Sequence, residues 1–170
     1  SNKGISAIDF SKKLMGQIVF IYFLQKKGWL GVQKRSDSTF DEWGTGPRNF
    51  LRKLFDKKTT SYDSFFNDVL EPLFYEALST DRSADNDYYS RFKCKIPFLN
   101  GGLFEPLNDY DWTGTDISIP NELFSNSIKT QTGDVGTGIL DVFDRYNFTV
   151  KEDDPIDKEV AVDPEMLGKV

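Results

Sequence analysis

The sequence predicts a mainly α protein with minor β structure, of the α+β class, in which a helical core precedes a loop-rich second half with short strands. In the first half, long stretches of apolar residues recur at helical spacing, whereas in the second half short apolar runs lie between turn residues. The 170 residues suffice for a real hydrophobic core, and we expect residues 1–170 to form a single domain.

A long helix is expected between Ser6 and Gly28. Ser6 and Asp9 form a start that resembles a capping box, and glycine is a typical helix end. Residues 18–24 (IVFIYFL) are apolar on every side of such a helix. This favours a central position in the core over the alternative of a buried strand.

A second helix is expected to open at Pro47, because proline suits the first helical position. Its apolar face would consist of Phe50, Leu51, Leu54 and Phe55. Its basic residues would point away from that face, and they are Arg48, Arg52 and Lys53.

A third helical stretch is expected to begin near Thr60 or Ser61 and to complete a helical part that spans residues 1–78. A continuous apolar stripe runs along it, made of Tyr62, Phe65, Phe66, Val69, Leu70, Leu73, Phe74, Ala77 and Leu78. Pro72 should kink or split this helix, because proline has no N–H to donate to the carbonyl of Asp68.

The second half is expected to be more irregular. Residues 79–90 are rich in Ser, Asp, Asn and Arg, which predicts an exposed loop. Residues 91–150 predict a mixed part with a turn at 100–102 (NGG). Strands are expected at 92–96, 116–119 and 147–150, and short helices at 121–124 and 138–146.

The last residues predict an acidic linker at 151–162 and a helix that starts at 163–170. Asp163 is a good capping residue, and Pro164 and Glu165 suit a first turn. Because so short a helix does not hold in water, we expect the chain to be a fragment of a larger protein.

The net charge of −6 is divided unevenly along the chain. Residues 1–58 carry 12 basic and 5 acidic groups, or +7, and residues 59–170 carry 9 basic and 22 acidic groups, or −13. A basic surface with Trp29 and Trp43 in it can neutralise phosphates, although it can also be merely solvated. The candidates for DNA contact are Lys26, Lys27, Lys34, Arg35, Arg48, Arg52, Lys53, Lys57 and Lys58.

Histidine is absent and Cys94 is the single cysteine, which excludes nucleophile pairs with histidine and a tetrahedral zinc site. A lone thiol fits a reducing cytoplasm. The longest apolar run, residues 18–24, is much shorter than the ~20 residues that cross a bilayer, so no membrane segment is expected.

Three weak motifs are better explained by local structure than by chemistry. Asp56-Lys57-Lys58 contains an acid-x-Lys pattern of nucleases, with Asp41 upstream, but it lies at an expected helix end. The two Gly-Thr-Gly sequences, at 44–46 and 136–138, lack the third glycine of a dinucleotide fingerprint. The carboxylates at 153–159 fit a solvated linker. We therefore assign no catalytic, cofactor-binding or metal residue.

Several blocks in this order resemble the segment before the methyltransferase domain of bacterial Eco57I-like type IIG restriction-modification enzymes and their adenine-specific relatives. The blocks are residues 18–30 (IVFIYFLQKKGWL), 70–75 (LEPLFY), 96–105 (IPFLNGGLFE) and 146–150 (YNFTV), the last leading to 163–168 (DPEMLG). The ordered set covers most of the chain, although each block alone is not specific.

The resemblance implies a helical connector without an active site, between an optional nuclease region and a domain that methylates adenine N6. The parent would use S-adenosylmethionine, and Mg²⁺ where it also cleaves DNA, and its partners would be double-stranded DNA and the flanking domains. The Pro-Pro-aromatic signature is absent, since Asp154-Pro155-Ile156 lacks the second proline and the aromatic residue. The Phe-x-Gly-x-Gly motif is absent as well. Two alternatives stay open: a module that docks on acidic partners or on the parent's own domains, and a free-standing Mg²⁺-dependent hydrolase.

Overall fold

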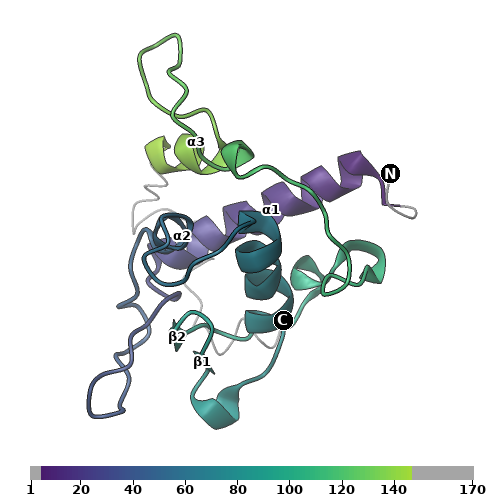
Figure 1. Ribbon diagram of the computed structural model, residues 1–170. Coiled ribbons are helices and arrows are strands. Elements are labelled where there is room, and N and C mark those ends of the chain that lie inside the picture. The colour runs from purple at the N-terminus through teal and green to yellow at the C-terminus, as the bar shows by residue number, and fades with distance from the viewer. Residues whose placement is uncertain (1–4, 147–170) are drawn as a thin grey trace, which may run out of the picture.

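Helix α1 (Ala7–Lys26) runs across the whole molecule, and the other elements pack around it (Figure 1). The computed structural model describes residues 5–146, and in these residues the fold is mainly α with minor β, as predicted. None of the described helices is both long and apolar enough to cross a membrane. The strand expected at 147–150, the linker at 151–162 and the helix start at 163–170 lie outside the described residues.

The predicted start, end and central position of α1 are confirmed. The Oγ of Ser6 accepts a hydrogen bond from the N–H of Asp9 at 3.3 Å, and Gly28 follows the helix with φ 72°. Ile18 and Ile21 are completely buried. The apolar face does not stay covered toward the N-terminus, where Ile8 is 67% exposed.

A loop of residues 31–46 leaves the end of α1 and returns to it. The N–H groups of Gly44 and Gly46 both donate to the carbonyl of Gly28, at 3.0 and 2.9 Å. A Cβ atom on Gly28 would lie 2.2 Å from the carbonyl oxygen of Gly44, and one on Gly46 would lie 2.0 Å from that of Leu30. The backbones therefore meet so closely that only glycine fits.

Helix α2 (Phe50–Phe55) is shorter than expected, because it begins three residues after Pro47. Phe50, Leu51 and Leu54 are buried, as their spacing predicted. The N–H of Leu51 donates to Oε1 of the buried Gln25 at 2.9 Å. This bond ties the first turn of α2 to the last turn of α1.

The third helical stretch begins at residue 65 rather than near Thr60, and it runs to residue 77 across α1 (Figure 1). Two π-helical turns, Phe66–Leu70 and Leu73–Ala77, flank Pro72. In these wider turns the N–H of Glu71 donates to Phe66 and that of Leu78 donates to Leu73. The helix therefore passes the proline without ending, and the whole predicted apolar stripe is buried.

In residues 5–146 the minor β structure is one antiparallel pair of β1 (Tyr88–Tyr89) and β2 (Cys94–Lys95). Strand β2 lies inside the strand predicted at 92–96, whereas β1 lies in the segment predicted as an exposed loop. The strand predicted at 116–119 is wrong, because those residues pair with no strand in the described part of the chain.

The short helical elements of the second half agree better with the sequence. A 3₁₀ turn at Asn121–Leu123 and helix α3 (Ile139–Arg145) occupy the two predicted short helices. The predicted turn at 100–102 leads directly into a 3₁₀ turn, Gly102–Phe104, which contacts α1.

Candidate nucleic-acid interface

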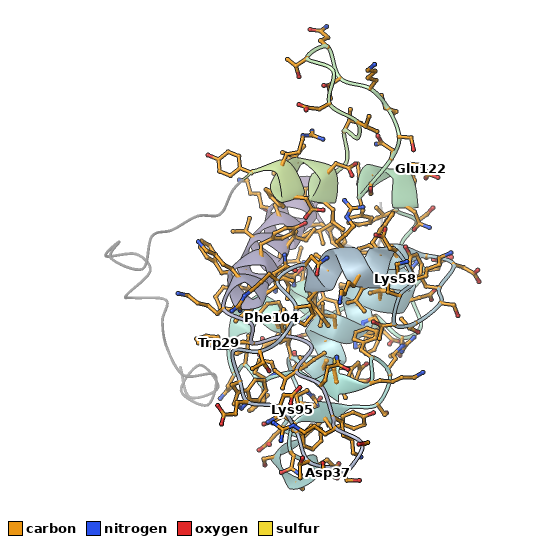
Figure 2. All side chains as sticks on the ribbon, turned by 90° about the vertical axis from the view of Figure 1, so that its left-hand side faces the viewer. Trp29, Asp37, Lys58, Lys95, Phe104 and Glu122 are labelled. Atoms are coloured by element: carbon orange, nitrogen blue, oxygen red, sulfur yellow. The ribbon has the colours of Figure 1, made fainter. Side chains whose placement is uncertain are left out.

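The cations predicted to contact DNA lie on three neighbouring pieces of chain: the end of α1, loop 31–46 and the segment around α2. Figure 2 turns this side toward the viewer, and Lys58, Lys95 and Asp37 follow one another from the middle to the bottom of the view. Lys26 and Lys27 are half-buried. The exposed members of the set are Lys34, Arg35, Arg48, Lys53, Lys57 and Lys58.

Loop 31–46 is held in a hairpin-like shape by a bridge between Lys34 and Phe40. At its tip Asp37 accepts hydrogen bonds from the N–H and hydroxyl of Thr39, and these bonds hold the pKa of Asp37 below its usual value. The Nε of Arg35 lies 2.7 Å from Oδ1 of Asp41. The loop thus presents Lys34 and Arg35 at the surface, the latter already beside one carboxylate.

Arg48 lies against the end of α1. A Cβ atom added to Gly28 would be only 2.2 Å from Nη1 of Arg48, so the guanidinium covers this glycine. A cation at this place is favoured by the partial negative charge of a helix C-terminus. Arg48 is nevertheless exposed, which leaves it available to a phosphate.

The end of α2 carries the other exposed cations. Lys57 adopts a left-handed conformation, φ 58°, just after the helix. Its Nζ lies 4.8 Å from the centre of the Tyr62 ring, a cation–π distance. The hydroxyl of Tyr62 donates to the carbonyl of Phe55, and burial raises the pKa of Tyr62 to about 12. Tyr62 is therefore a neutral platform for Lys57.

Arg52 does not point away from the core, as its position in the sequence had suggested. Its guanidinium donates to Oδ2 of Asp144 at 2.8 Å, to Oδ1 of Asp141 at 3.0 Å and to Oγ of Ser125 at 2.8 Å. Burial acts to lower the pKa of Arg52, but the contacts with Asp144 and Asp141 outweigh it and the pKa is raised. Arg52 joins α2 to α3, so it is the weakest of the nine DNA-contact candidates.

Asp141 is the centre of this network. Its side chain is 9% exposed, and it accepts from the N–H groups of Gly138 and Asn126 at 3.0 Å and from Oγ of Ser125 at 2.7 Å. Burial acts to raise the pKa of Asp141, but these hydrogen bonds and Arg52 hold it below its usual value. The negative charge of Asp141 is therefore satisfied by partners within the protein.

Sequence reasoning missed a cluster of aromatic rings and lysines beside the predicted cations. The Nζ of Lys95 lies 4.2 Å from the Trp43 ring centre and 5.4 Å from that of Phe40. The Nζ of Lys34 lies 5.2 Å from the Tyr88 ring centre. These residues meet because Lys95 bridges to Val32 and the N–H of Gly31 donates to the carbonyl of Lys95, a pairing that no local pattern signals.

The weak motifs do not converge on a site. Asp41 is paired with Arg35, and Asp56 lies 3.8 Å from Arg52. Residues 5–146 contain no group of three or more acidic, cysteine or histidine side chains that could hold a metal ion. Cys94 is buried, and burial raises its pKa to about 12, which keeps it in the unreactive thiol form.

The chain is similar to part of a much longer protein. No protein-family model matches the chain, and no solved structure matches it. A protein of Methanocaldococcus jannaschii named "Putative type II restriction enzyme and methyltransferase" is 30% identical over 165 residues, which are 95% of this chain. The chain spans about 11% of the length of that protein. The chain is therefore related to a segment of a restriction-modification enzyme.

Proposed function

We propose, from this relationship, that the chain is a non-catalytic connector of a DNA modification or restriction-modification enzyme and that it positions flanking catalytic domains on double-stranded DNA. The parent would be an adenine-N6 methyltransferase of the type IIG kind that uses S-adenosylmethionine, with an Mg²⁺-dependent endonuclease where it also cleaves. Its place of action would be the cytoplasm.

The exposed basic surface is the observation that carries this proposal. Arg48, Lys53 and Lys58 are exposed on or beside α2, and Lys34 and Arg35 are exposed on the adjoining loop 31–46. Phosphate contacts from such side chains fix the position of a protein on a duplex without reading its sequence. A connector needs only this kind of contact.

The relative supports the proposal that this segment belongs to a restriction-modification enzyme. The name of that protein joins a restriction enzyme and a methyltransferase, and this chain matches about 11% of its length. The sequence of this chain lacks both the Pro-Pro-aromatic signature and the Phe-x-Gly-x-Gly motif of adenine methyltransferases. Positioning rather than chemistry is therefore the role that these residues support.

Binding of duplex DNA at several salt concentrations tests the proposal. Fluorescence anisotropy with a labelled duplex of about 20 base pairs should show binding at ~50 mM salt that weakens steeply by ~200 mM, since phosphate contacts release counterions. The triple variant Arg48→Glu, Lys53→Glu, Lys58→Glu should abolish it. The triple variant Lys12→Glu, Arg91→Glu, Lys129→Glu changes exposed cations elsewhere by the same net charge and is the matched control.

Two results would overturn direct DNA contact. One is the absence of binding by the unaltered chain at ~50 mM salt, where such contacts are strong. The other is an equal loss of affinity in both triple variants, because that result would reflect net charge and not a defined surface.

Docking on the parent's own domains is the second candidate, and exposed apolar residues favour it. A groove of about 300 Å³ lies between the first half of α1 and residues 117–123, with Phe10, Leu14 and Ile119 in its lining. Leu123 at its edge is 50% exposed. Binding of the separately expressed methyltransferase region, lost in Leu123→Asp and without any binding of DNA, would favour this candidate over the first.

A further inference from the structure

A cavity of about 520 Å³ opens between loop 31–46 and residues 80–90. It lies beside the tip of the loop, which Asp37 marks at the bottom of Figure 2. Its volume falls in the range of sites for small organic ligands, ~300–1,000 Å³. Of the predicted DNA contacts only Lys34 lines it, so the cavity is distinct from the surface around α2.

The far wall of the cavity is built around Arg82. The guanidinium of Arg82 donates to the carbonyls of Ile96 at 2.7 Å, Thr80 at 3.0 Å and Tyr88 at 3.3 Å, and also to that of Ala77. One half-buried cation thus holds together the end of the third helical stretch, strand β1 and the residue that follows β2. The wall is therefore formed before any ligand arrives, which lowers the cost of binding.

Two aromatic rings form the apolar part of the cavity. The rings of Phe40 and Tyr88 lie 5.8 Å apart at 49°, and both are half-exposed. The Nζ of Lys34 lies over the Tyr88 ring, 5.2 Å from its centre, and Lys34 is exposed, so that its ammonium can turn from the ring toward a phosphate. Half-exposed aromatic rings beside an exposed lysine can hold a base by stacking and the attached phosphate by charge.

The remaining side chains that line the cavity are polar, and a hydrogen bond holds one of them in place. The hydroxyl of Tyr89 donates to Oε1 of Glu76 at 2.5 Å, which orients this carboxylate at the cavity. Asn86 and Ser90 add an amide and a hydroxyl. Carboxylates and amides pair with the amino groups and ring nitrogens at the edge of a nucleobase.

We propose that this cavity binds a single unstacked nucleotide, whose base lies on Phe40 and Tyr88, whose edge faces Glu76 and Asn86, and whose phosphate lies at Lys34. The ligand is either a free mononucleotide or an unpaired nucleotide of a nucleic-acid strand, which share this chemistry. The inference goes beyond the proposed duplex contact and does not depend on it, because a base paired inside a duplex cannot enter the cavity.

Nuclear magnetic resonance titrations with the full chain test this inference. The four deoxynucleoside monophosphates, a single-stranded hexanucleotide, a blunt duplex and inorganic phosphate are added separately. We expect amide shifts of residues 34–40 and 82–90 to saturate with at least one mononucleotide or with the single strand, and not with the duplex. Stronger binding of the strand identifies nucleic acid as the ligand, and binding of mononucleotide alone identifies a free nucleotide.

Variants separate base stacking from simple charge attraction. Tyr88→Leu should weaken nucleotide binding at least tenfold. If Tyr88→Leu fails to fold, Asn86→Gly, which suits the left-handed backbone of this residue (φ 56°), should do the same. Tyr146→Leu removes another exposed aromatic residue and should leave binding unchanged. Saturation at these amides by inorganic phosphate with the same affinity, or no shift with any nucleotide at millimolar concentration, would overturn the inference. Duplex anisotropy on the same samples shows separately whether the proposed function fails.

Discussion

Arg52 and Asp141 form an ion pair, with 3.0 Å between Nη2 and Oδ1, that joins α2 to α3. Arg52 also lies 2.8 Å from Asp144, which in turn accepts from the hydroxyl of Tyr22 on α1 at 2.6 Å. One guanidinium therefore connects the two short helices to each other and to the long one. It acts within the fold rather than on a ligand.

Arg52→Ala should lower the free energy of unfolding by about 2–3 kcal/mol, because it leaves the nearly buried Asp141 without its cation. Lys53→Ala, the neighbouring exposed position, should change it by no more than ~0.5 kcal/mol. Urea unfolding followed by circular dichroism measures both. Equal effects of the two substitutions would contradict the structural role of Arg52.

Glu71 should make stability depend on pH. It is buried, its Oε2 accepts from the hydroxyl of Tyr110 at 2.6 Å, and Oε1 has no hydrogen-bond partner among residues 5–146. Burial raises the pKa of Glu71 to about 7 from its ordinary 4.5, although the Tyr110 bond opposes the shift. The fold thus favours the protonated form. The stabilisation that protonated Glu71 gives the fold is complete below pH ~4.5 and is lost as the pH rises through 7.

Glu71→Gln removes this titration and should leave a chain that is more stable than the unaltered one above pH 7, by roughly 3 kcal/mol, with little difference near pH 4.5. Thermal unfolding between pH 4.5 and 8.5 measures the difference. Tyr110→Phe is a useful companion, since loss of its hydrogen bond should move the transition to higher pH. Parallel pH profiles of the unaltered chain and Glu71→Gln would refute a titrating Glu71.

Gly28→Ala should be strongly destabilising. The residue has φ 72°, and a Cβ atom there would lie 2.2 Å from both the Gly44 carbonyl oxygen and Arg48 Nη1. We expect a loss of more than ~2 kcal/mol in unfolding free energy. Gly102→Ala is the matched control, because nothing lies within 4 Å of its Cβ position. Comparable midpoints of urea unfolding for the two variants would contradict the close contact at Gly28.

The salt dependence of DNA binding should show which cations contact phosphate groups. Removal of two phosphate contacts in Lys53→Ala with Lys58→Ala should reduce the slope of log affinity against log salt by about 1.8. Lys93→Ala with Lys129→Ala replaces exposed lysines outside the basic surface of α2 and loop 31–46, and it should leave the slope unchanged. Anisotropy titrations at four salt concentrations provide the slopes. An unchanged slope in the first pair would remove both lysines from the interface.

Local signals in the sequence predicted the helices well. Ser6 caps α1 and Gly28 ends it because both effects depend on residues within one turn. The apolar stripe from Tyr62 to Leu78 was equally clear, since a helix that buries one face must repeat its spacing. The mainly α fold class followed from these elements.

Contacts between residues far apart in the chain could not be predicted from the sequence. The place of Arg52 is decided by Asp141 and Asp144, far along the chain, so the helix spacing alone put it wrongly in solvent. Lys95 and Trp43 meet only through the bridge to Val32. The π turns were also not foreseen, because the sequence specified only that Pro72 must disturb the helix.

The two π turns on either side of Pro72 have a consequence for insertion and deletion along this helix. A π turn holds one residue more than the α-helical turn that it replaces. Deletion of one residue from Phe66–Leu70 can therefore be absorbed by conversion of that turn to α-helix, which keeps the buried Phe65 and Phe74 in their present orientation relative to each other. Homologous chains that differ in length by one residue at this point can thus retain the same core.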